Sequence, residues 1–403
     1  MIKKTRRTIA YIVLTAVLLS VLSGCATWDN FYKAFIDPPE VKETIKIAIL
    51  EPLTGIDAKD ASAEVAGIEL AHEMFGSALG KDVELVYYDT KSSLEDLQEA
   101  ALSLCSAEEH ISLVLGCYGN AMTIAAGDIF KENYMPAIAM TCTNPLITRT
   151  NPYYARVCYI DLYEAAAAAE FVYGYLETGS AAILTQRNND YSKAKGEEFA
   201  ERLKELTGKE YIPVTAYDPQ NTNLEAILRA FSLADSTVVY LPENAETAKT
   251  VIAKAEELGL EFDWVGTSNW DGSDLDGVYF TVDYSADRYQ TAMTARFNSA
   301  YADKYGKDKT PPAEAALGFD AYLLAIRGLE DAQTEKIGSM ISQKIREVSG
   351  LEGATGTITM NELGDPVKSI MINRSSEGKQ TTVYTIDPAK PAEDNSTDDT
   401  PNT

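Results

Sequence analysis

The chain has 403 residues, of which 61 are acidic and 35 are basic, and its formal net charge is −26. So strong a negative charge repels nucleic-acid phosphates and anionic lipids, which argues against a nucleic-acid partner. The two histidines and five cysteines form no cluster with the spacing of zinc ligands, so we expect no metal site and no cofactor.

Residues 1–24 are typical of a signal peptide. Four basic residues precede an apolar run over residues 9–22 that is short for a transmembrane span, and small residues follow it. Cys25 comes directly after Leu22-Ser23-Gly24, which resembles the bacterial lipobox. The resemblance implies cleavage before Cys25, lipidation of its sulfur and a mature protein anchored at the extracytoplasmic face of the bacterial cell membrane. An uncleaved N-terminal anchor is the alternative, and it too would put the protein outside the cell.

Two further segments are predicted to lie outside the folded part. Residues 25–43 hold Pro38-Pro39 and scattered charge, and residues 389–403 contain almost nothing apolar. Neither segment can bury enough apolar surface to offset its chain entropy, so we expect a tether and a disordered acidic tail. The residues between them are enough for two domains.

The first half of this central part alternates between strand and helix patterns. Short apolar and β-branched runs predict strands at residues 45–50, 83–88, 111–116 and 137–140. Apolar residues at helical spacing predict helices at residues 65–75, 94–104 and 123–133. Three successive βα units imply a parallel sheet with right-handed crossovers.

The same alternation restarts after an extended segment at residues 155–159. Strands are predicted at residues 181–185, 211–217, 237–241 and 262–266, and helices at residues 162–177, 193–207, 224–233 and 245–258. Beyond them we expect an extended segment at 277–282, long helices at 289–305 and 313–331, and a hairpin formed by 356–360 and 367–373. The fold class is therefore α/β, with two doubly wound parallel-sheet lobes between which the chain crosses more than once.

Two loops stand out in the first lobe. The strand at 111–116 runs into Cys117-Tyr118-Gly119-Asn120, and the strand at 137–140 runs into Thr141-Cys142-Thr143-Asn144-Pro145. Because parallel strands end at the same edge of a sheet, these loops place small hydroxyls, amides and free backbone N–H groups together. We expect a ligand to bind there.

Several segments together resemble the type I periplasmic binding proteins, specifically the branched-chain amino acid (leucine, isoleucine, valine) group that serves ABC transporters. They are Ile45-Lys46-Ile47-Ala48, Pro52-Leu53-Thr54-Gly55, 115–130, Thr143-Asn144-Pro145, 266–272, 277–280, 316–321 and 353–359. The resemblance covers about residues 44–388. It rests on the order and spacing of these segments, since no single one is diagnostic.

The resemblance implies two lobes joined by three hinge crossovers that close around a ligand, with no chemistry. Lobe 1 would comprise 44–160 plus 284–354, and lobe 2 would comprise 161–283 plus 355–388. The crossings are expected near 159–162, 281–284 and 353–356. The implied partners are a small amino acid-like ligand and the permease subunits of an ABC importer.

The same resemblance assigns roles to residues of the two loops. Asn120, Ala121, Thr141 and Thr143 match the positions that hold the carboxylate of an amino acid, which suits hydroxyls and a helix N-terminus. Tyr191 matches a tyrosine of the second lobe that packs over the ligand backbone. The alternative is that the threonines only cap the following turn and that Tyr191 is an exposed loop residue.

The partner of the ligand ammonium is where the sequence departs from this group. Leucine-binding members carry an acid just after the strand that ends here at Gly266, where this chain has Thr267-Ser268. Because a buried unpaired ammonium is costly, we expect Glu243 or Asp271 to replace that acid, or else a different kind of ligand. Either acid could equally be a solvated surface residue.

The side-chain pocket of the ligand is less well defined by the sequence. Tyr118 and Trp270 are the expected apolar walls, although Trp270 could be a core residue instead. Some relatives carry an aromatic residue near 54–60, where this chain has Asp60. The expected ligand is a branched-chain or other neutral amino acid.

An enzyme and a sensory receptor are the alternative functions. Cys117 precedes a predicted helix, where a thiolate could be activated, but neither His72 nor His110 is placed to serve as its base, and no catalytic motif occurs, so we expect no enzyme. A ligand-sensing lipoprotein receptor that feeds a signalling partner, or the binding of a solute that is not an amino acid, stays open. The spacing of Cys105, Cys117, Cys142 and Cys158 decides neither disulfides nor free thiols.

Overall fold

A computed structural model describes residues 43–387 apart from residues 221, 287 and 289–290. The predicted signal peptide, the lipidation site Cys25, nearly all of the tether and the predicted tail at 389–403 lie outside these residues. Within the described part, no helix combines the length and apolar character that a membrane span requires.

The first sheet has six strands in the order β2-β3-β1-β4-β5-β6 and is parallel apart from the short strand β2. The strands are β1 (Ile45–Glu51), β2 (Ser77–Ala78), β3 (Lys81–Asp89), β4 (Ile111–Gly116), β5 (Ala137–Ala139) and β6 (Tyr154–Arg156). The helices that connect them are α2 (Ala58–Met74), α3 (Leu94–Leu104), α4 (Asn120–Glu132) and α5 (Leu146–Arg149). Every predicted strand of this half is present.

The second sheet has seven strands in the order β16-β15-β11-β10-β9-β7-β8, of which β7 to β11 are parallel and β15 and β16 antiparallel. The strands are β7 (Ala181–Gln186), β8 (Val214–Tyr217), β9 (Val238–Tyr240), β10 (Asp263–Gly266), β11 (Tyr279–Val282), β15 (Ile370–Ser376) and β16 (Lys379–Ile386). The helices are α6 (Asp161–Gly174), α7 (Asp190–Thr207), α8 (Leu224–Leu233) and α9 (Ala245–Glu257), with the short η2 (Ser268–Trp270) after β10. The predicted α/β class is confirmed.

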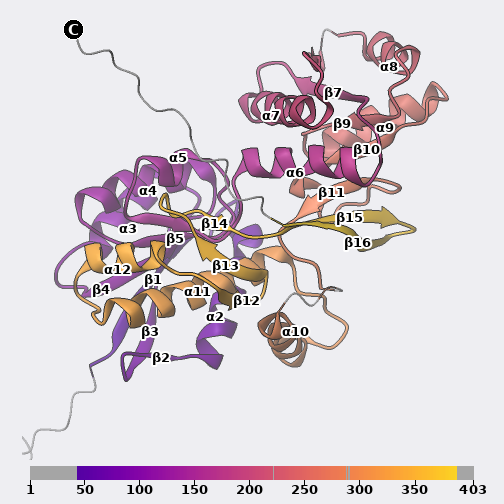
Figure 1. Cartoon of the computed structure of the whole chain (residues 1–403). Coiled ribbons are helices and arrows are strands. Elements are labelled where there is room, and N and C mark those ends of the chain that lie inside the picture. Colours follow the sequence, from indigo (N-terminus) through magenta and orange to yellow (C-terminus); the bar gives the residue numbers. More distant parts are fainter. Residues whose placement is uncertain (1–42, 221, 287, 289–290, 388–403) are drawn as a thin grey trace, which may run out of the picture. The chain divides into compact units, whose positions relative to one another are not determined.

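The remaining elements return the chain to the first sheet and back again (Figure 1). They are α10 (Ala292–Tyr305), α11 (Ala313–Ala332), α12 (Gly338–Arg346) and the strands β12 (Leu351–Gly353), β13 (Gly356–Met360) and β14 (Pro366–Val367) of a small third sheet. Helix α11 shares the hydrophobic core of β1 and β4, whereas β15 shares the core of β7 and β9. The chain therefore passes between the two cores after β6, after β11 and before β15.

The predicted hairpin at 356–360 and 367–373 is partly wrong. Strand β13 pairs with β14 over only two residue pairs, and β15 pairs instead with β11 and β16 in the second sheet. Ile370, Met371 and Ile372 are all fully buried, so this run needs cover on both faces, which a lone hairpin cannot provide. The sequence patterns also gave no sign of α12 or β16.

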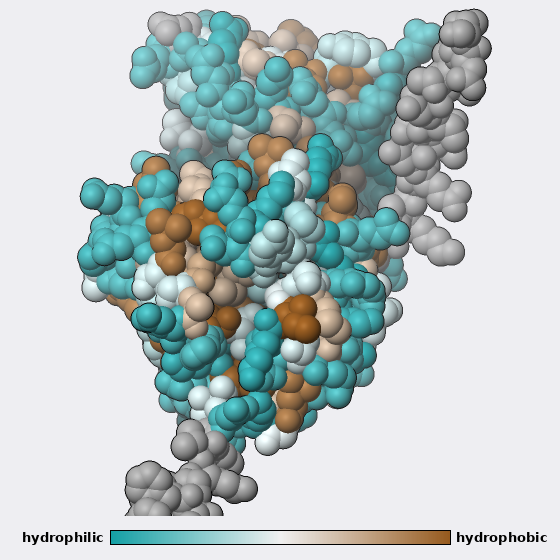
Figure 2. Space-filling model, turned by 90° about the vertical axis from the view of Figure 1, so that its left-hand side faces the viewer, coloured by the Kyte–Doolittle hydropathy of each residue, from teal (hydrophilic) through white to brown (hydrophobic). Residues whose placement is uncertain are grey.

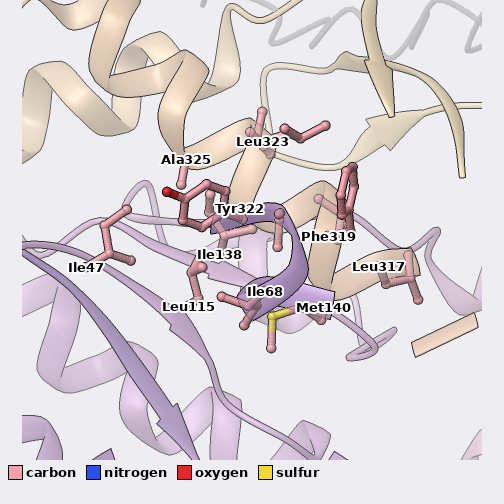
Figure 3. Close-up of a cluster of buried hydrophobic side chains, with 14 of the residues drawn as sticks. Ile47, Ile68, Leu115, Ile138, Met140, Leu317, Phe319, Tyr322, Leu323 and Ala325 are labelled. Carbon is pink, nitrogen blue, oxygen red and sulfur yellow. The ribbon is translucent and has the colours of Figure 1, made fainter. Parts of the chain in front are cut away.

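Helices α2 and α11 approach each other closely because both carry glycine at the contact. A Cβ atom on Gly67 would lie 1.9 Å from the carbonyl oxygen of Ala315, and one on Gly318 would lie 2.1 Å from that of Glu64. Figure 3 shows the core beside this contact, where Tyr322 of α11 lies near Ile138 and Leu115 of the sheet. This packing fixes the position of α2, which carries residues of the site.

The surface is that of an acidic protein in water. Hydrophilic side chains predominate on the face that Figure 2 shows, with hydrophobic ones scattered among them. Single exposed apolar residues such as Ile56 and Leu233 are common on folded proteins and do not by themselves indicate a partner.

Candidate functional site

A cavity of about 1510 Å³ opens at the carboxyl ends of strands from both sheets. Its lining includes the loops that follow β4, β5 and β10, together with the start of α2, the start of α11 and residues of β15. Strand ends of parallel sheets are where α/β proteins bind ligands. The volume is large enough for any amino acid with water around it.

The loop after β4 is shaped by Gly119 and Asn120. Gly119 has a φ of 85°, a left-handed conformation that glycine adopts without strain, and Asn120 then begins α4. The Oδ1 atom of Asn120 accepts a hydrogen bond from the backbone N–H of Asn144, 3.1 Å away, so the two predicted loops are linked. Tyr118, Gly119 and Asn120 line the cavity, and the free N–H groups at the start of α4 favour an anion. Ala121 is exposed beside them but is not among the lining residues.

The loop after β5 brings Thr141 and Thr143 to the cavity wall. Beneath it, the fully buried guanidinium of Arg156 donates to the carbonyl oxygens of Cys142 (2.7 Å) and Asn144 (2.8 Å). Asp365 pairs with the same guanidinium at 2.7 Å. Arg156 therefore holds the shape of this loop from within the protein, and a lone arginine between Ala155 and Val157 is the sequence signal that could have revealed it.

Tyr191 stands at the cavity wall from the first turn of α7. It is half-buried, and its hydroxyl accepts a hydrogen bond of 3.0 Å from the side-chain amide of Asn269, in the loop after β10. The ammonium of Lys195 lies 4.6 Å from the centroid of the Tyr191 ring. Burial raises the pKa of Tyr191, so its hydroxyl stays neutral and able to donate.

The loop after β10 accepts support from an acid of α6. Glu164 is 1% exposed, accepts a hydrogen bond of 2.7 Å from the backbone N–H of Ser268, and also pairs with the hydroxyl of Thr281. Lys195, itself fully buried, contacts Glu164 and lies 3.0 Å from Asp161. This carboxylate is thus already neutralised within the protein.

Glu243 and Trp270 lie away from the cavity. Glu243 is 2% exposed and accepts hydrogen bonds from the backbone N–H of Gln186 (2.9 Å), from Asn189 (3.3 Å) and from Ser192. Trp270 is fully buried, belongs to the core of the second sheet, and donates its indole N–H to the backbone oxygen of Glu243 at 2.8 Å. Both residues order the start of α7 and the loop after β10, and neither is among the lining residues.

Asp271 does line the cavity and faces other acids there. Its pKa is raised to about 6, mainly by burial and then by repulsion from Glu314 at the start of α11. Its side chain keeps contact with the solvent of the cavity. The lining also includes Asp60 and Asp283, and Asp283 pairs with Lys368 at 2.9 Å. Since Lys59 is the only basic residue among the described lining residues, the cavity favours a ligand with a positive group.

Two buried acids lie behind the lining residues and were not predicted from the sequence. Glu51 ends β1 and Glu64 lies on α2, and both are 0% exposed. The hydroxyl of Thr141 donates to Oε1 of Glu64 at 2.5 Å. Glu64 falls four residues before Ile68, on the apolar face of its helix, and Glu51 ends an apolar strand. An acidic residue within a pattern that predicts burial is the signal by which the sequence could have revealed both.

Cys117 lacks the setting of a nucleophile. It is 1% exposed, and burial raises its pKa well above the ordinary value, with Glu51 adding to the rise. Cys105, Cys117, Cys142 and Cys158 are all free thiols. Among the described residues, no group of three or more histidine, cysteine or acidic side chains could hold a metal ion.

Residues 44–378 match the family model described as periplasmic binding protein. The chain belongs to the periplasmic binding protein family. Its relatives place it among the type I proteins of the branched-chain amino acid group, as the sequence resemblance indicated.

Individual members of this family show how far the likeness extends. A Pseudomonas aeruginosa protein that binds leucine, isoleucine, valine, threonine and alanine is 22% identical over 343 residues, which cover 80% of this chain and 87% of that protein. The leucine-binding protein LivK of Thermotoga maritima is 27% identical with a TM-score of 0.72, over 85% of this chain and 99% of that one. A solute-binding protein from R. palustris in complex with benzoate is 18% identical with a TM-score of 0.69, over 87% and 98%, and therefore shares the fold.

The fold thus brings six of the nine predicted ligand-binding residues of this periplasmic binding protein to one cavity. They are Tyr118, Asn120, Thr141, Thr143, Tyr191 and Asp271. Ala121 adjoins the cavity in sequence, and Glu243 and Trp270 belong to the supporting core. That these residues bind a ligand stays a prediction.

Proposed function

We propose that this protein is the extracytoplasmic solute-binding component of an ABC importer and that it captures an amino acid-like ligand without altering it. One observation carries the proposal. The cavity combines hydroxyls and a helix N-terminus on one wall with an aromatic ring and a carboxylate on the other, which suits the two charged ends of an amino acid.

The carboxylate of the ligand would lie at the loops after β4 and β5. The N–H groups at the start of α4 and the hydroxyls of Thr141 and Thr143 are the donors on this wall. Asn120 ties the two loops together, and Arg156 fixes the second from beneath. Preset donors of this kind lose little entropy when an anion binds.

The ammonium of the ligand would lie near Asp271, which takes the place of the acid that relatives carry after β10. Glu243 is less suited because its carboxylate is already satisfied by three donors inside the second core. Burial, and then repulsion from Glu314, raises the pKa of Asp271, and a bound ammonium would stabilise its charged form. Tyr191 would pack over the ligand backbone between the two ends.

The proposed protein works at the cell membrane and delivers its ligand to a permease. Lipidation at Cys25 would anchor it at the membrane, the two lobes at 44–160 plus 284–354 and 161–283 plus 355–388 would close around the ligand, and permease subunits would receive it. The ligand proposed from the resemblance is a branched-chain or other neutral amino acid. The Pseudomonas and Thermotoga relatives, which bind amino acids, support this choice.

An aromatic carboxylate is the alternative ligand. Two proteins of the same fold bind benzoate and 3,4-dihydroxybenzoic acid. Such a ligand carries no positive group, however, and would leave Asp271, Asp60 and Glu314 unpaired in the cavity. The electrostatics therefore favour the amino acid.

A thermal-shift screen with one solute per well tests the proposal. The twenty amino acids, benzoate, a sugar and a nucleoside form the panel, and a binding solute raises the melting temperature by mass action. We expect a neutral amino acid to give the largest shift and to be recovered unchanged by mass spectrometry. If benzoate alone raised the melting temperature, the ligand would be an aromatic carboxylate and not an amino acid. Recovery of a chemically altered solute would indicate an enzyme.

A further inference from the structure

Glu51 and Glu64 form a buried pair of acids without a basic partner. Both are 0% exposed, and no lysine, arginine or histidine among the described residues makes an ion pair with either. Both oxygens of Glu51 and Oε2 of Glu64 lack a donor if the two groups are treated as carboxylates. Two neighbouring buried carboxylates would combine a desolvation cost with like-charge repulsion.

One bound proton removes this conflict. A carboxylate can only accept hydrogen bonds, whereas a protonated carboxyl can donate one to its neighbour. Burial raises the pKa of Glu51 well above its ordinary value. Repulsion from Glu64 and hydrogen bonding to it add to the rise, and the nearby backbone N–H of Tyr118 opposes it. The pKa of Glu64 is raised to about 8, again mainly by burial, against the hydrogen bond from Thr141. Glu51 is therefore the acid that keeps its proton and can donate it to Glu64, whereas Glu64 is the group of the pair that can titrate.

The hydroxyl of Thr141 connects Glu64 to the cavity. Thr141 lines the cavity, and its Oγ1 atom lies 2.5 Å from Oε1 of Glu64, which does not line it. A threonine hydroxyl has one hydrogen to donate. When Glu64 is ionised, that hydrogen must point at Glu64 and only lone pairs face the ligand. When Glu64 carries a proton of its own, in addition to the one on Glu51, and donates it to Thr141, the threonine hydrogen is free to point into the cavity.

We propose that Glu64 is a positioning residue that sets the direction of the Thr141 hydroxyl, so that a ligand carboxylate binds together with a proton on the Glu51–Glu64 pair. The inference rests on the proposed function, because it requires a ligand whose carboxylate meets Thr141. The Thr141 hydroxyl can donate a hydrogen bond to a bound carboxylate only when Glu64 is protonated. Affinity is then highest where Glu64 is protonated and falls as the pH rises through its pKa.

The other titratable groups that face the pair do not account for such a pH dependence. Cys117, Cys142 and Tyr118 face it from the loops after β4 and β5, Tyr154 faces it from β6, and burial raises the pKa of each. Glu314 faces it from α11 and raises the pKa of Glu64 by repulsion. Arg156 opposes the rise in the pKa of Cys142, and its guanidinium forms an ion pair with Asp365.

The test measures the dissociation constant of L-leucine, or of the tightest amino acid of the panel, by calorimetry between pH 7 and pH 9. In the unaltered protein, binding is expected to weaken about tenfold over this range, since one proton is gained with the ligand. In Glu64→Gln the side chain at this position no longer titrates, so affinity should change less than about twofold between pH 7 and pH 9. Glu73→Gln, the same change at an exposed position of α2, should behave as the unaltered protein.

A second readout needs no variant. Titrations at pH 8 in two buffers of different ionisation enthalpy give the protons taken up per ligand, and we expect uptake that is absent in Glu64→Gln. Equal pH profiles in the unaltered protein and Glu64→Gln, or no proton uptake by the unaltered protein, would overturn the inference while leaving amino acid binding intact. Failure of every amino acid to bind at any pH would instead contradict the proposed function and this inference with it.

Discussion

Thr141 and Thr143 are two residues apart and line the same cavity, yet they differ in their surroundings. Thr141 is tied to the buried Glu64, whereas Thr143 is half-buried and its backbone oxygen accepts from the N–H of Asp161 at 3.3 Å. Thr143 therefore offers the simpler test of the carboxylate wall, because its replacement leaves the acid pair in place.

Replacing Thr143 by alanine should weaken amino acid binding by about 1–3 kcal/mol through the loss of a charge-assisted hydrogen bond. Stability should change little, since the side chain faces the cavity. Calorimetry measures the affinity, and Thr150→Ala, an exposed threonine seven residues on that does not line the cavity, is the control. Unchanged affinity in Thr143→Ala would make that threonine a structural residue only.

Replacing Asp271 by asparagine tests the other wall. In the unaltered protein the pKa of Asp271 is about 6, so its carboxylate is lost as the pH falls below that value, and amino acid affinity should fall with it. Asp271→Asn should bind the amino acid weakly at pH 7, and its affinity should no longer fall as the pH is lowered through 6. Asp274→Asn is the matched control, because Asp274 also lines the cavity but pairs with Lys249 on the exposed rim. Equal losses in both variants would mean that general negative charge, and not Asp271, attracts the ligand.

How far the site could be predicted differs from residue to residue. The loops after β4 and β5 follow from strand ends and small polar residues, so Asn120, Thr141 and Thr143 could be found. Glu243 and Trp270 follow the strands that lead to the cavity, but their side chains turn into the core. There Ser192 donates to the Glu243 carboxylate, and the Trp270 indole donates to the Glu243 backbone oxygen. The position of a residue in the sequence does not predict this direction of its side chain. The Glu51–Glu64 pair needs a contact between a strand and a helix, which no local pattern contains.

At the level of elements, α2 and α11 depend on each other. The two helices share the core of the first sheet, and Gly67 and Gly318 let them approach until backbone meets backbone. Helix α2 carries Glu64, and the start of α11 carries Glu314 of the cavity lining. The helix contact therefore positions parts of the site as well as the fold.

Replacing Gly67 by alanine should destabilise the protein by about 1–3 kcal/mol or more, because the new Cβ atom would lie 1.9 Å from the carbonyl oxygen of Ala315. Chemical denaturation measures the loss. Gly174→Ala is the control, since the nearest atom to its Cβ would be the Tyr384 hydroxyl at an ordinary 3.5 Å. A Gly67→Ala variant as stable as Gly174→Ala would show that the helices can separate at little cost.

Most elements could be predicted because strand and helix periods alternate clearly from β1 to β10. The late part was harder for a physical reason. Strand β15 pairs with β11, almost a hundred residues earlier in the chain, so its partner is decided by the tertiary fold and not by the turn that precedes it. Helix α12 packs Ile341 and Ile345 into the first core, another long-range contact.

At the scale of the whole molecule, three chain passages join the two cores, and side chains tie the later two together. Lys368 lies 2.9 Å from Asp283 and donates to the hydroxyl of Thr355 at 3.0 Å, and Asp320 of α11 accepts from the N–H of Thr355 at 3.0 Å. We propose these passages as the hinges of lobe closure. Closure would bring the carboxylate wall and the acidic wall onto one ligand.

The central claim is that this cavity holds an unmodified amino acid, and native mass spectrometry tests it most directly. The protein is mixed with an equimolar panel of the twenty amino acids, benzoate and 3,4-dihydroxybenzoic acid at pH 7. We expect a one-to-one complex whose added mass is that of an intact amino acid, and its loss in Asp271→Asn. A complex with an aromatic acid only, an altered ligand mass, or no complex at all would contradict the claim.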